Sequence, residues 1–177
     1  MNREEFIKSL NLKGLGIEIG VQSGNYSSKI LEYSNLHLIL LDSWRELNDY
    51  HDKANVNTEK HIMFMNNTLK KLKEFDGRFT LMRELSEIAV DFFKDEIFDF
   101  IYMDANHSEE FVYNDLIRWY PKVKKGGILA GHDYLNLKEE INDFGVKDAV
   151  DKFFYEKDII VNTVDIHFPT WFIQKPL

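Results

Sequence analysis

The sequence predicts an α/β fold in which helices cover both faces of a mostly parallel, seven-stranded sheet. Three observations support this prediction. Short apolar runs alternate with segments of helical periodicity through most of the chain, which favours parallel strands joined by right-handed crossovers. The run 36–41 lacks polar alternation, as expected of a strand that is covered on both faces. Two apolar stretches joined through Phe168 and Pro169 predict a closing antiparallel hairpin near the C-terminus.

Each element of this fold has a local signal. We expect strands over 15–20, 36–41, 79–82, 98–103, 128–130, 159–164 and 171–173, and helices over 4–10, 23–33, 59–75, 86–93, 108–123 and 146–155. In the helix 108–123, Val112, Leu116 and Trp119 line one face, and the glycine pair 126–127 ends the helix. The segment 43–57 is polar and irregular, which indicates a loop or lid.

The composition sets the broad class of protein. A chain of 177 residues with 44% hydrophobic content suits one domain over 1–177 with a sizeable core. The net charge of −8 argues against nucleic acid as a partner, and the short basic run 122–125 is interpreted as a solvated helix end. The absence of cysteine excludes disulfides, thiolate catalysis and cysteine-based zinc sites. No apolar stretch approaches the length of a membrane span, so we expect a cytoplasmic protein without a membrane partner.

The first candidate motif joins the first strand to the helix after it. Gly20 and Gly24 let the backbone turn sharply and let a ligand approach closely. The amides at the start of the following helix suit a carboxylate or a phosphate. Glu18 lies within the strand pattern, where a carboxyl group needs a polar partner. The spacing is G-x-x-x-G rather than the dinucleotide fingerprint G-x-G-x-x-G, and an ordinary strand-to-helix turn remains the alternative.

The second candidate is Asp42 at the end of the second strand. An acid at this place can accept both hydroxyls of a ribose, and it lies about 20 residues after the glycine turn, as in dinucleotide folds. Its alternative role is a turn or cap aspartate. Trp44 follows, and its ring either stacks on a nucleoside or packs in the core.

Polar side chains also follow the fourth and fifth strands. Asp104 and His107 come after the fourth strand, and His132 and Asp133 after the fifth. Neighbouring parallel strands end at the same edge of a sheet, so these loops should meet there. Two aspartates and two histidines can hold a divalent cation, or provide a base with its orienting partner. The alternative is that they cap helices and bind backbone amides.

These stretches together resemble the class I methyltransferases that depend on S-adenosylmethionine (AdoMet) and have a Rossmann-like fold. The segments 98–107 (Phe-Asp-Phe-Ile-Tyr-Met-Asp-Ala-Asn-His) and 126–134 (Gly-Gly-Ile-Leu-Ala-Gly-His-Asp-Tyr) are similar to small methyltransferase domains whose fourth strand ends D-x-x-H and whose fifth strand ends G-H-D-Y. The segment 18–24 resembles motif I of the same class. The resemblance covers roughly the whole chain in the order that the class requires, and it is specific for the class rather than for the substrate.

The resemblance implies a role for each strand-end residue. The methionine part of AdoMet would lie against the glycine turn, the ribose against Asp42, and the adenine beside Ser86. The expected cofactor-binding set is Glu18, Gly20, Gly24, Tyr26, Ser27, Asp42, Ser43, Trp44, Ser86 and Asp104. Related sugar and macrolide O-methyltransferases bind magnesium through carboxylates after the fourth and fifth strands, which implies Asp104 and Asp133 as metal ligands here.

The sequence departs from that pattern at two positions. His132 stands where some of those enzymes have another aspartate, and Asn106 where some have the base. A magnesium ion and the identity of the base therefore stay open, with His107, His132 and Asp133 as the candidate catalytic groups. An alcohol acceptor needs its proton removed, or its pKa lowered by a metal.

The resemblance implies a small hydroxylated acceptor, with a sugar or a polyketide-like compound as the expected class. The loop 43–57 or a second subunit of a homo-oligomer would cover it. One rival function is a nicotinamide-dependent (NAD) oxidoreductase, which the missing third glycine and the lack of a suitably placed Tyr-x-x-x-Lys pair disfavour. The other is a non-catalytic partner subunit with the AdoMet fold, which the intact motif I and the polar strand ends disfavour.

Overall fold

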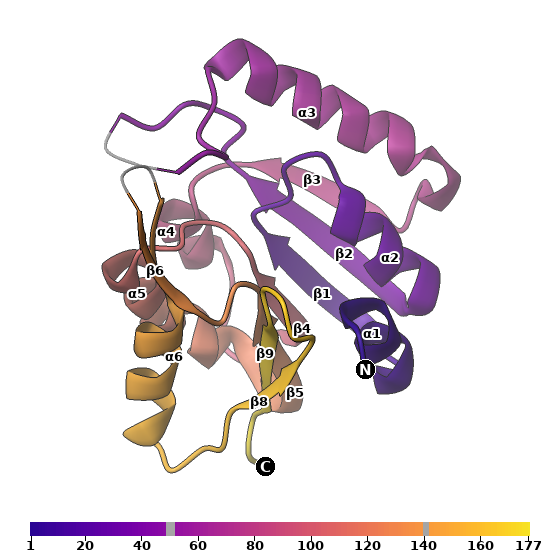
Figure 1. Cartoon of the computed structure of the whole chain (residues 1–177). Coiled ribbons are helices and arrows are strands. Elements are labelled where there is room, and N and C mark those ends of the chain that lie inside the picture. Colours follow the sequence, from indigo (N-terminus) through magenta and orange to yellow (C-terminus); the bar gives the residue numbers. More distant parts are fainter. Residues whose placement is uncertain (49–51, 140–141) are drawn as a thin grey trace.

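The computed structural model describes residues 1–48, 52–139 and 142–177. Figure 1 shows a seven-stranded sheet between two layers of helices, which confirms the predicted fold class. The strands of this sheet are β1 (Lys13–Ile19), β2 (Asn35–Asp42), β3 (Phe79–Arg83), β4 (Phe98–Met103), β5 (Val123–Gly131), β8 (Asn162–Val164) and β9 (Thr170–Gln174). The helices are α1 (Arg3–Leu10), α2 (Asn25–Tyr33), α3 (Thr58–Lys71), α4 (Ser86–Ala89), α5 (Glu109–Trp119) and α6 (Val146–Tyr155).

The order of strands across the sheet is β3-β2-β1-β4-β5-β9-β8. Strands β1 to β5 pair in parallel, and β9 runs antiparallel to both β5 and β8. The chain moves outward from β1 to β3 and then returns to place β4 against the free edge of β1. This return makes a switch point between β1 and β4, where sheets of this kind bind ligands at the carboxyl ends of their strands.

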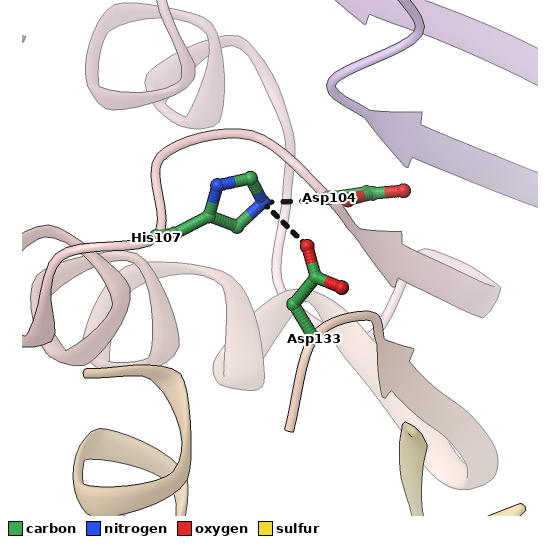
Figure 2. A group of neighbouring side chains, drawn as sticks. All are labelled: Asp104, His107 and Asp133. Atoms are coloured by element: carbon green, nitrogen blue, oxygen red, sulfur yellow. Dashed lines mark ion pairs between the residues drawn. The ribbon is translucent and has the colours of Figure 1, made fainter. Parts of the chain in front are cut away.

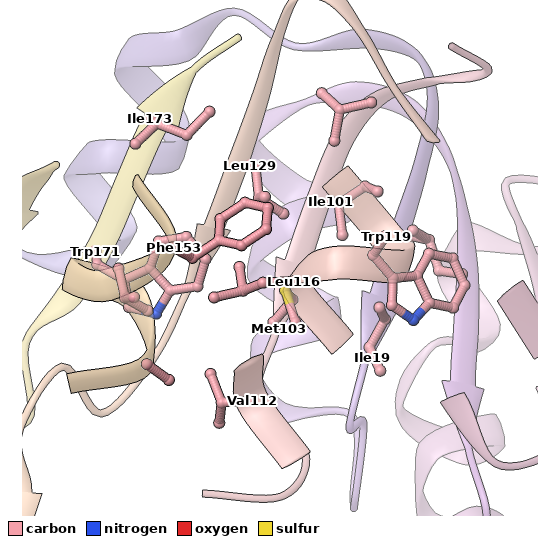
Figure 3. Close-up of a cluster of buried hydrophobic side chains, with 14 of the residues drawn as sticks. Ile19, Ile101, Met103, Val112, Leu116, Trp119, Leu129, Phe153, Trp171 and Ile173 are labelled. Carbon is pink, nitrogen blue, oxygen red and sulfur yellow. The ribbon is translucent and has the colours of Figure 1, made fainter. Parts of the chain in front are cut away.

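Two hydrophobic clusters hold the layers together. Along β4, Phe100 and Tyr102 join the cluster under α1 and α2, whereas Ile101 and Met103 join the cluster under α5 and α6. This division follows from the alternation of side chains across a strand. Figure 3 shows the second cluster, in which Trp119 is fully buried and contributes on the order of 2–3 kcal/mol by leaving water. The strand ends at the switch point therefore rest on packed layers.

The predicted helix 108–123 is wrong at its C-terminal end. Helix α5 ends at Trp119, a 3-10 turn covers Tyr120–Lys122, and β5 already begins at Val123. Pro121 explains the difference, because proline has no N–H for the helical ladder and its ring clashes with the preceding turn.

The interpretation of the basic run 122–125 changes with this boundary. Most of the run lies at the start of β5 rather than at a helix end, and Lys124 forms an ion pair of 2.8 Å with Asp99 on β4. The glycine pair 126–127 likewise lies inside β5 and does not end a helix.

Two further segments differ from expectation. A small antiparallel hairpin, β6 (Asn136–Glu139) and β7 (Asn142–Gly145), was not predicted. Strand β8 covers only the last three residues of the predicted strand 159–164. The loop 43–57 connects β2 to α3, and its residues 49–51 lie outside the described residues. No helix in the described part of the chain is long and apolar enough to cross a membrane.

Candidate functional site

The glycine turn follows β1 at the switch point. Gly20 has φ +91°, a conformation that favours glycine, and its N–H donates to the carbonyl of Leu41 at 2.8 Å. A Cβ placed on Gly20 would lie 2.0 Å from the carbonyl oxygen of Asp104. Gly24 is the N-cap of α2 and also has positive φ. The turn therefore contacts the end of β4 directly, and only glycine leaves room for that approach.

Asp42 organises the same turn. One of its carboxylate oxygens accepts hydrogen bonds from the N–H groups of Val21 and Gln22, at 2.9 and 2.8 Å. The other oxygen accepts from the N–H of Trp44 at 2.7 Å. The first oxygen thus has both lone pairs engaged, whereas the second keeps one, so the carboxylate can hold the turn and still accept a ligand hydroxyl.

Glu18 is buried beneath the turn, with 1% of its surface exposed. Burial raises its pKa to about 8, although the hydroxyl of Ser27, which donates to its carboxylate, acts in the opposite direction. Tyr26 packs against Tyr102 of β4, with ring centroids 4.4 Å apart. This part of the predicted cofactor set thus forms one connected layer beneath the turn.

The remaining predicted cofactor residues occupy different environments. Trp44 is fully buried in the core, where its indole N–H donates to the carbonyl of Gln22 at 2.8 Å, so its ring has no exposed face for stacking. The carbonyl of Ser43 accepts from the Arg83 side chain at 3.2 Å. Ser86 is the first residue of α4, and its hydroxyl donates to the carboxylate of Asp115 at 2.9 Å.

The strand-end cluster consists of Asp104, His107, His132 and Asp133, and the structure brings all four together. Figure 2 shows one nitrogen of the His107 imidazole facing two carboxylates: its Nε2 atom lies 3.6 Å from Asp104 and 3.2 Å from Asp133. The Nδ1 atom of His132 lies 2.9 Å from Asp133 and 3.8 Å from Asp104. The expectation that the loops after β4 and β5 would meet is correct.

Opposing effects set the charges in this cluster. Burial by itself would lower the pKa of His107, but its contacts with Asp104 and Asp52 outweigh burial and raise the pKa to about 10. Burial would raise the pKa of Asp104, but His107, His132 and Arg3 together hold it below its usual value. The cluster is therefore a compact set of opposite charges in a partly desolvated place.

The same cluster has the donor set of a cation site. Ligand atoms of Asp104, His107 and Asp133 lie within 4.8 Å of one another. One oxygen of Asp133 is buried and accepts no hydrogen bond of normal geometry from the described residues, although His132 lies close to it. A cavity of about 20 Å³ adjoins Asp104, His107 and His132. That volume suits one water molecule or one ion, so the residues fit a hard cation bound mainly by carboxylate oxygens.

Two residues at this edge were missed by sequence reasoning. Asp52 lies in the loop 43–57 and contacts Nδ1 of His107 at 2.8 Å, with only 6% of its side chain exposed. Arg3 comes from α1 and lies 3.9 Å from the second oxygen of Asp104. Neither residue belongs to a motif or follows a strand, so no local signal in the sequence could have found them.

Comparisons with known proteins agree with this geometry. A family model described as a methyltransferase domain matches residues 17–134, which include the glycine turn and the strand-end cluster. The sequence matches no curated protein.

Solved structures share the fold at low sequence identity. The O-methyltransferase NovP has 20% identity and a TM-score of 0.66, with 99% of this chain and 80% of that chain covered. An rRNA methylase from Streptococcus thermophilus has 11% identity and a TM-score of 0.66, covering 98% of this chain and 94% of that chain. A methyltransferase from Geobacter sulfurreducens has 14% identity and a TM-score of 0.64, with 98% and 78% covered.

The switch point of the sheet carries a glycine turn over a buried glutamate, and a methyltransferase-domain model matches the same part of the chain. Together these findings define an AdoMet-dependent methyltransferase of Rossmann-like fold. The chain belongs to the methyltransferase-domain family whose model spans residues 17–134. Its cofactor is accordingly AdoMet.

Replacing Asp42 tests the ribose end of the cofactor site. We expect Asp42→Ala to weaken binding of S-adenosylhomocysteine by about 1–3 kcal/mol, because a charged hydrogen-bond acceptor is lost. The fold should survive, since the aspartate lies at a strand end. Calorimetric titration measures the change, and the exposed Asp76→Ala is the matched control. Unchanged affinity in Asp42→Ala would remove this residue from the site.

Replacing Glu18 tests the buried carboxyl group. Its pKa of about 8 in the folded protein exceeds the 4.5 of the unfolded chain, so the folded protein binds the extra proton between these values. The wild type should therefore lose stability relative to Glu18→Gln as pH rises from 5 to 8, by up to about 4 kcal/mol.

Urea unfolding of the ligand-free protein at both pH values measures this difference. The exposed Glu4→Gln is the control and should follow the wild type. A stability difference between the wild type and Glu18→Gln that does not change with pH would show that Glu18 is ionised in the folded protein.

Proposed function

We propose that this methyltransferase acts on a hydroxyl group of a small molecule. The observation that carries the proposal is the convergence of Asp104, His107 and Asp133 beside the glycine turn. A hydroxyl acceptor needs a group that removes its proton or a cation that lowers its pKa, and this cluster contains residues suited to either role. NovP, which shares the fold, is named as an O-methyltransferase.

The cofactor side of the site would be built from the turn and its supports. Gly20 and Gly24 would lie against the methionine part, and Asp42 would accept the ribose hydroxyls. Asp104 would face either the amino group or a metal ion. AdoMet supplies an electrophilic methyl group on its sulfonium when bound. The protein's contribution is to align the acceptor with that group and to exclude water.

Two versions of the acceptor side remain, and they differ in the role of the cluster. In the metal version, Asp104 and Asp133 hold a magnesium-like ion that lowers the pKa of the acceptor hydroxyl, with His107 or His132 near the acceptor. In the base version, His132 takes the proton from the acceptor directly, or His107 does so after it loses the proton that its raised pKa of about 10 retains at neutral pH. The Asp52 carboxylate on Nδ1 of His107 would orient that ring in both versions.

The cover of the acceptor is also a proposal. The loop 43–57 supplies Asp52 to the edge of the cluster, which supports the loop as a lid over a sugar or polyketide-like acceptor. A second subunit in a homo-oligomer is the other way to enclose the site. We propose a cytoplasmic enzyme. We also propose that nucleic acid is not its partner, because its net charge is −8.

Ligand binding tests the cofactor assignment first. S-adenosylhomocysteine should raise the melting temperature, and NAD should not. Stabilisation by NAD alone would favour the nicotinamide-dependent oxidoreductase. Binding of S-adenosylhomocysteine without methyl transfer to any acceptor would favour the non-catalytic partner subunit.

Methyl transfer tests the acceptor class. The enzyme is incubated with AdoMet and magnesium and with three acceptor sets: hydroxylated sugars and polyketides, small amines, and ribosomal RNA. Mass spectrometry should find a methyl ether on a hydroxylated small molecule. Methylation of RNA or amines alone would contradict the proposal.

A further inference from the structure

Arg3 lies at the switch point although it precedes the segment that the family model matches. Its guanidinium lies 4.3 Å above the ring of Tyr26, and one of its nitrogens lies 3.9 Å from Asp104. About a third of the side chain is exposed. A cation is thus positioned beside Asp104, the residue whose backbone carbonyl lies against Gly20 of the glycine turn.

The N-terminal helix holds this cation in place. Asn2 caps α1, and its side chain and that of Glu5 form a reciprocal capping box. Phe6 and Ile7 are buried in the cluster beneath the helix. The guanidinium therefore projects from an anchored element rather than from a loose terminus.

The charges of Arg3 and Asp104 are complementary to the two charged groups of an amino acid. The methionine part of AdoMet carries an ammonium group and a carboxylate on one carbon atom. Asp104 supplies the negative charge for the ammonium group in the proposed site, and Arg3 supplies a positive charge next to it. An ion pair of this kind can open to accept both charges of a zwitterion in an alternating arrangement.

Two other cations near the turn, Lys71 and Arg83, already donate to backbone carbonyls. Lys71 donates to the carbonyl of Ser23. Arg83 donates to the carbonyls of Ser43 and Trp44. Of these three cations, Arg3 is the one that lies next to the Asp104 carboxylate, and its guanidinium also interacts with the hydroxyl of Tyr102. Arginine also suits a ligand carboxylate because its planar donors match a carboxylate in pairs.

We propose that Arg3 binds the carboxylate of the methionine moiety of the cofactor. Arg3 would thereby select a cofactor whose methionine moiety keeps its carboxylate. It lies before residues 17–134, the segment that the family model matches. This inference rests on the proposed placement of Asp104 at the amino group.

Decarboxylated AdoMet tests the inference, because it keeps the ammonium and sulfonium groups and lacks only the carboxylate. In calorimetric titrations the wild type should bind AdoMet roughly 10–100 times more tightly than decarboxylated AdoMet. Arg3→Gln should bring this ratio below about threefold, mainly by weakening AdoMet. Arg3→Lys, which keeps the charge without the paired donors, should give an intermediate ratio.

Lys8→Gln is the matched control, because Lys8 lies on the same helix and over a tyrosine ring, that of Tyr33. It should keep the ratio of the wild type, and the melting temperature checks the fold of every variant. If Arg3→Gln weakened the affinity for both ligands equally, or left both affinities unchanged, the inference about Arg3 would be overturned and the proposed cofactor site would stand. A wild type that binds neither ligand would overturn the proposed cofactor site as well.

Discussion

Asp133→Asn is expected to lower kcat/KM by at least about 100-fold, a loss typical of removing a group that acts on the transferred proton. Asp133 faces Nε2 of His107 and Nδ1 of His132, so its charge acts on both candidate bases. Its backbone has φ +52°, which asparagine tolerates better than alanine. The substitution therefore removes the charge and leaves the turn intact.

Asp158→Asn is the matched control for this experiment. Asp158 also has positive φ, at +54°, and is exposed, so it reports the backbone effect alone. Unchanged kcat/KM in Asp133→Asn would remove the carboxylate from the mechanism.

Magnesium titration of the same proteins separates the two versions of the acceptor side. In the metal version the wild type releases or takes up heat on binding magnesium, and Asp133→Asn does not. Absence of heat in both proteins, together with the loss of activity in the variant, would leave the histidine base as the mechanism.

Gly20→Ala is expected to abolish cofactor binding and to lower the free energy of unfolding by about 3 kcal/mol or more. The added methyl group would overlap the carbonyl of Asp104, and neither strand end can move without disturbing the switch point. Urea unfolding and titration with S-adenosylhomocysteine measure the two effects.

Gly77→Ala separates backbone strain from the steric clash. Gly77 has φ +79°, close to that of Gly20, but a Cβ there meets nothing within 4 Å. It should cost only the strain of the left-handed conformation, about 1–2 kcal/mol, and should leave cofactor affinity unchanged. Equal losses of stability in the two variants would show that the contact between the turn and β4 does not matter.

The parts of the site that the sequence predicted are those that follow strands. Apolar runs mark the strands, and parallel topology then places Asp42, Asp104 and Asp133 at one edge of the sheet. This argument needs only the pattern along the chain. It correctly placed His107 and His132 in one cluster, because β4 and β5 are neighbours.

The parts that were missed depend on tertiary contacts. Asp52 reaches His107 across 55 residues from an irregular segment, and Arg3 reaches Asp104 from the first helix. The end of α5 was placed too late because the apolar spacing continues to Val123, whereas Pro121 ends the helix locally. The position of Trp44 also depends on tertiary contacts, because its place in the sequence could not decide whether its ring stacks on a nucleoside or packs in the core.

The neighbouring positions of β1 and β4 also govern the order of folding. Leu15 on β1 donates its N–H to the carboxylate of Asp99 on β4, 84 residues later in the chain. During synthesis the central strand β1 must therefore leave one edge without a partner until β4 emerges, and such distant pairings slow folding. Because the cofactor site forms at this seam, cofactor binding will report that β1 and β4 have paired.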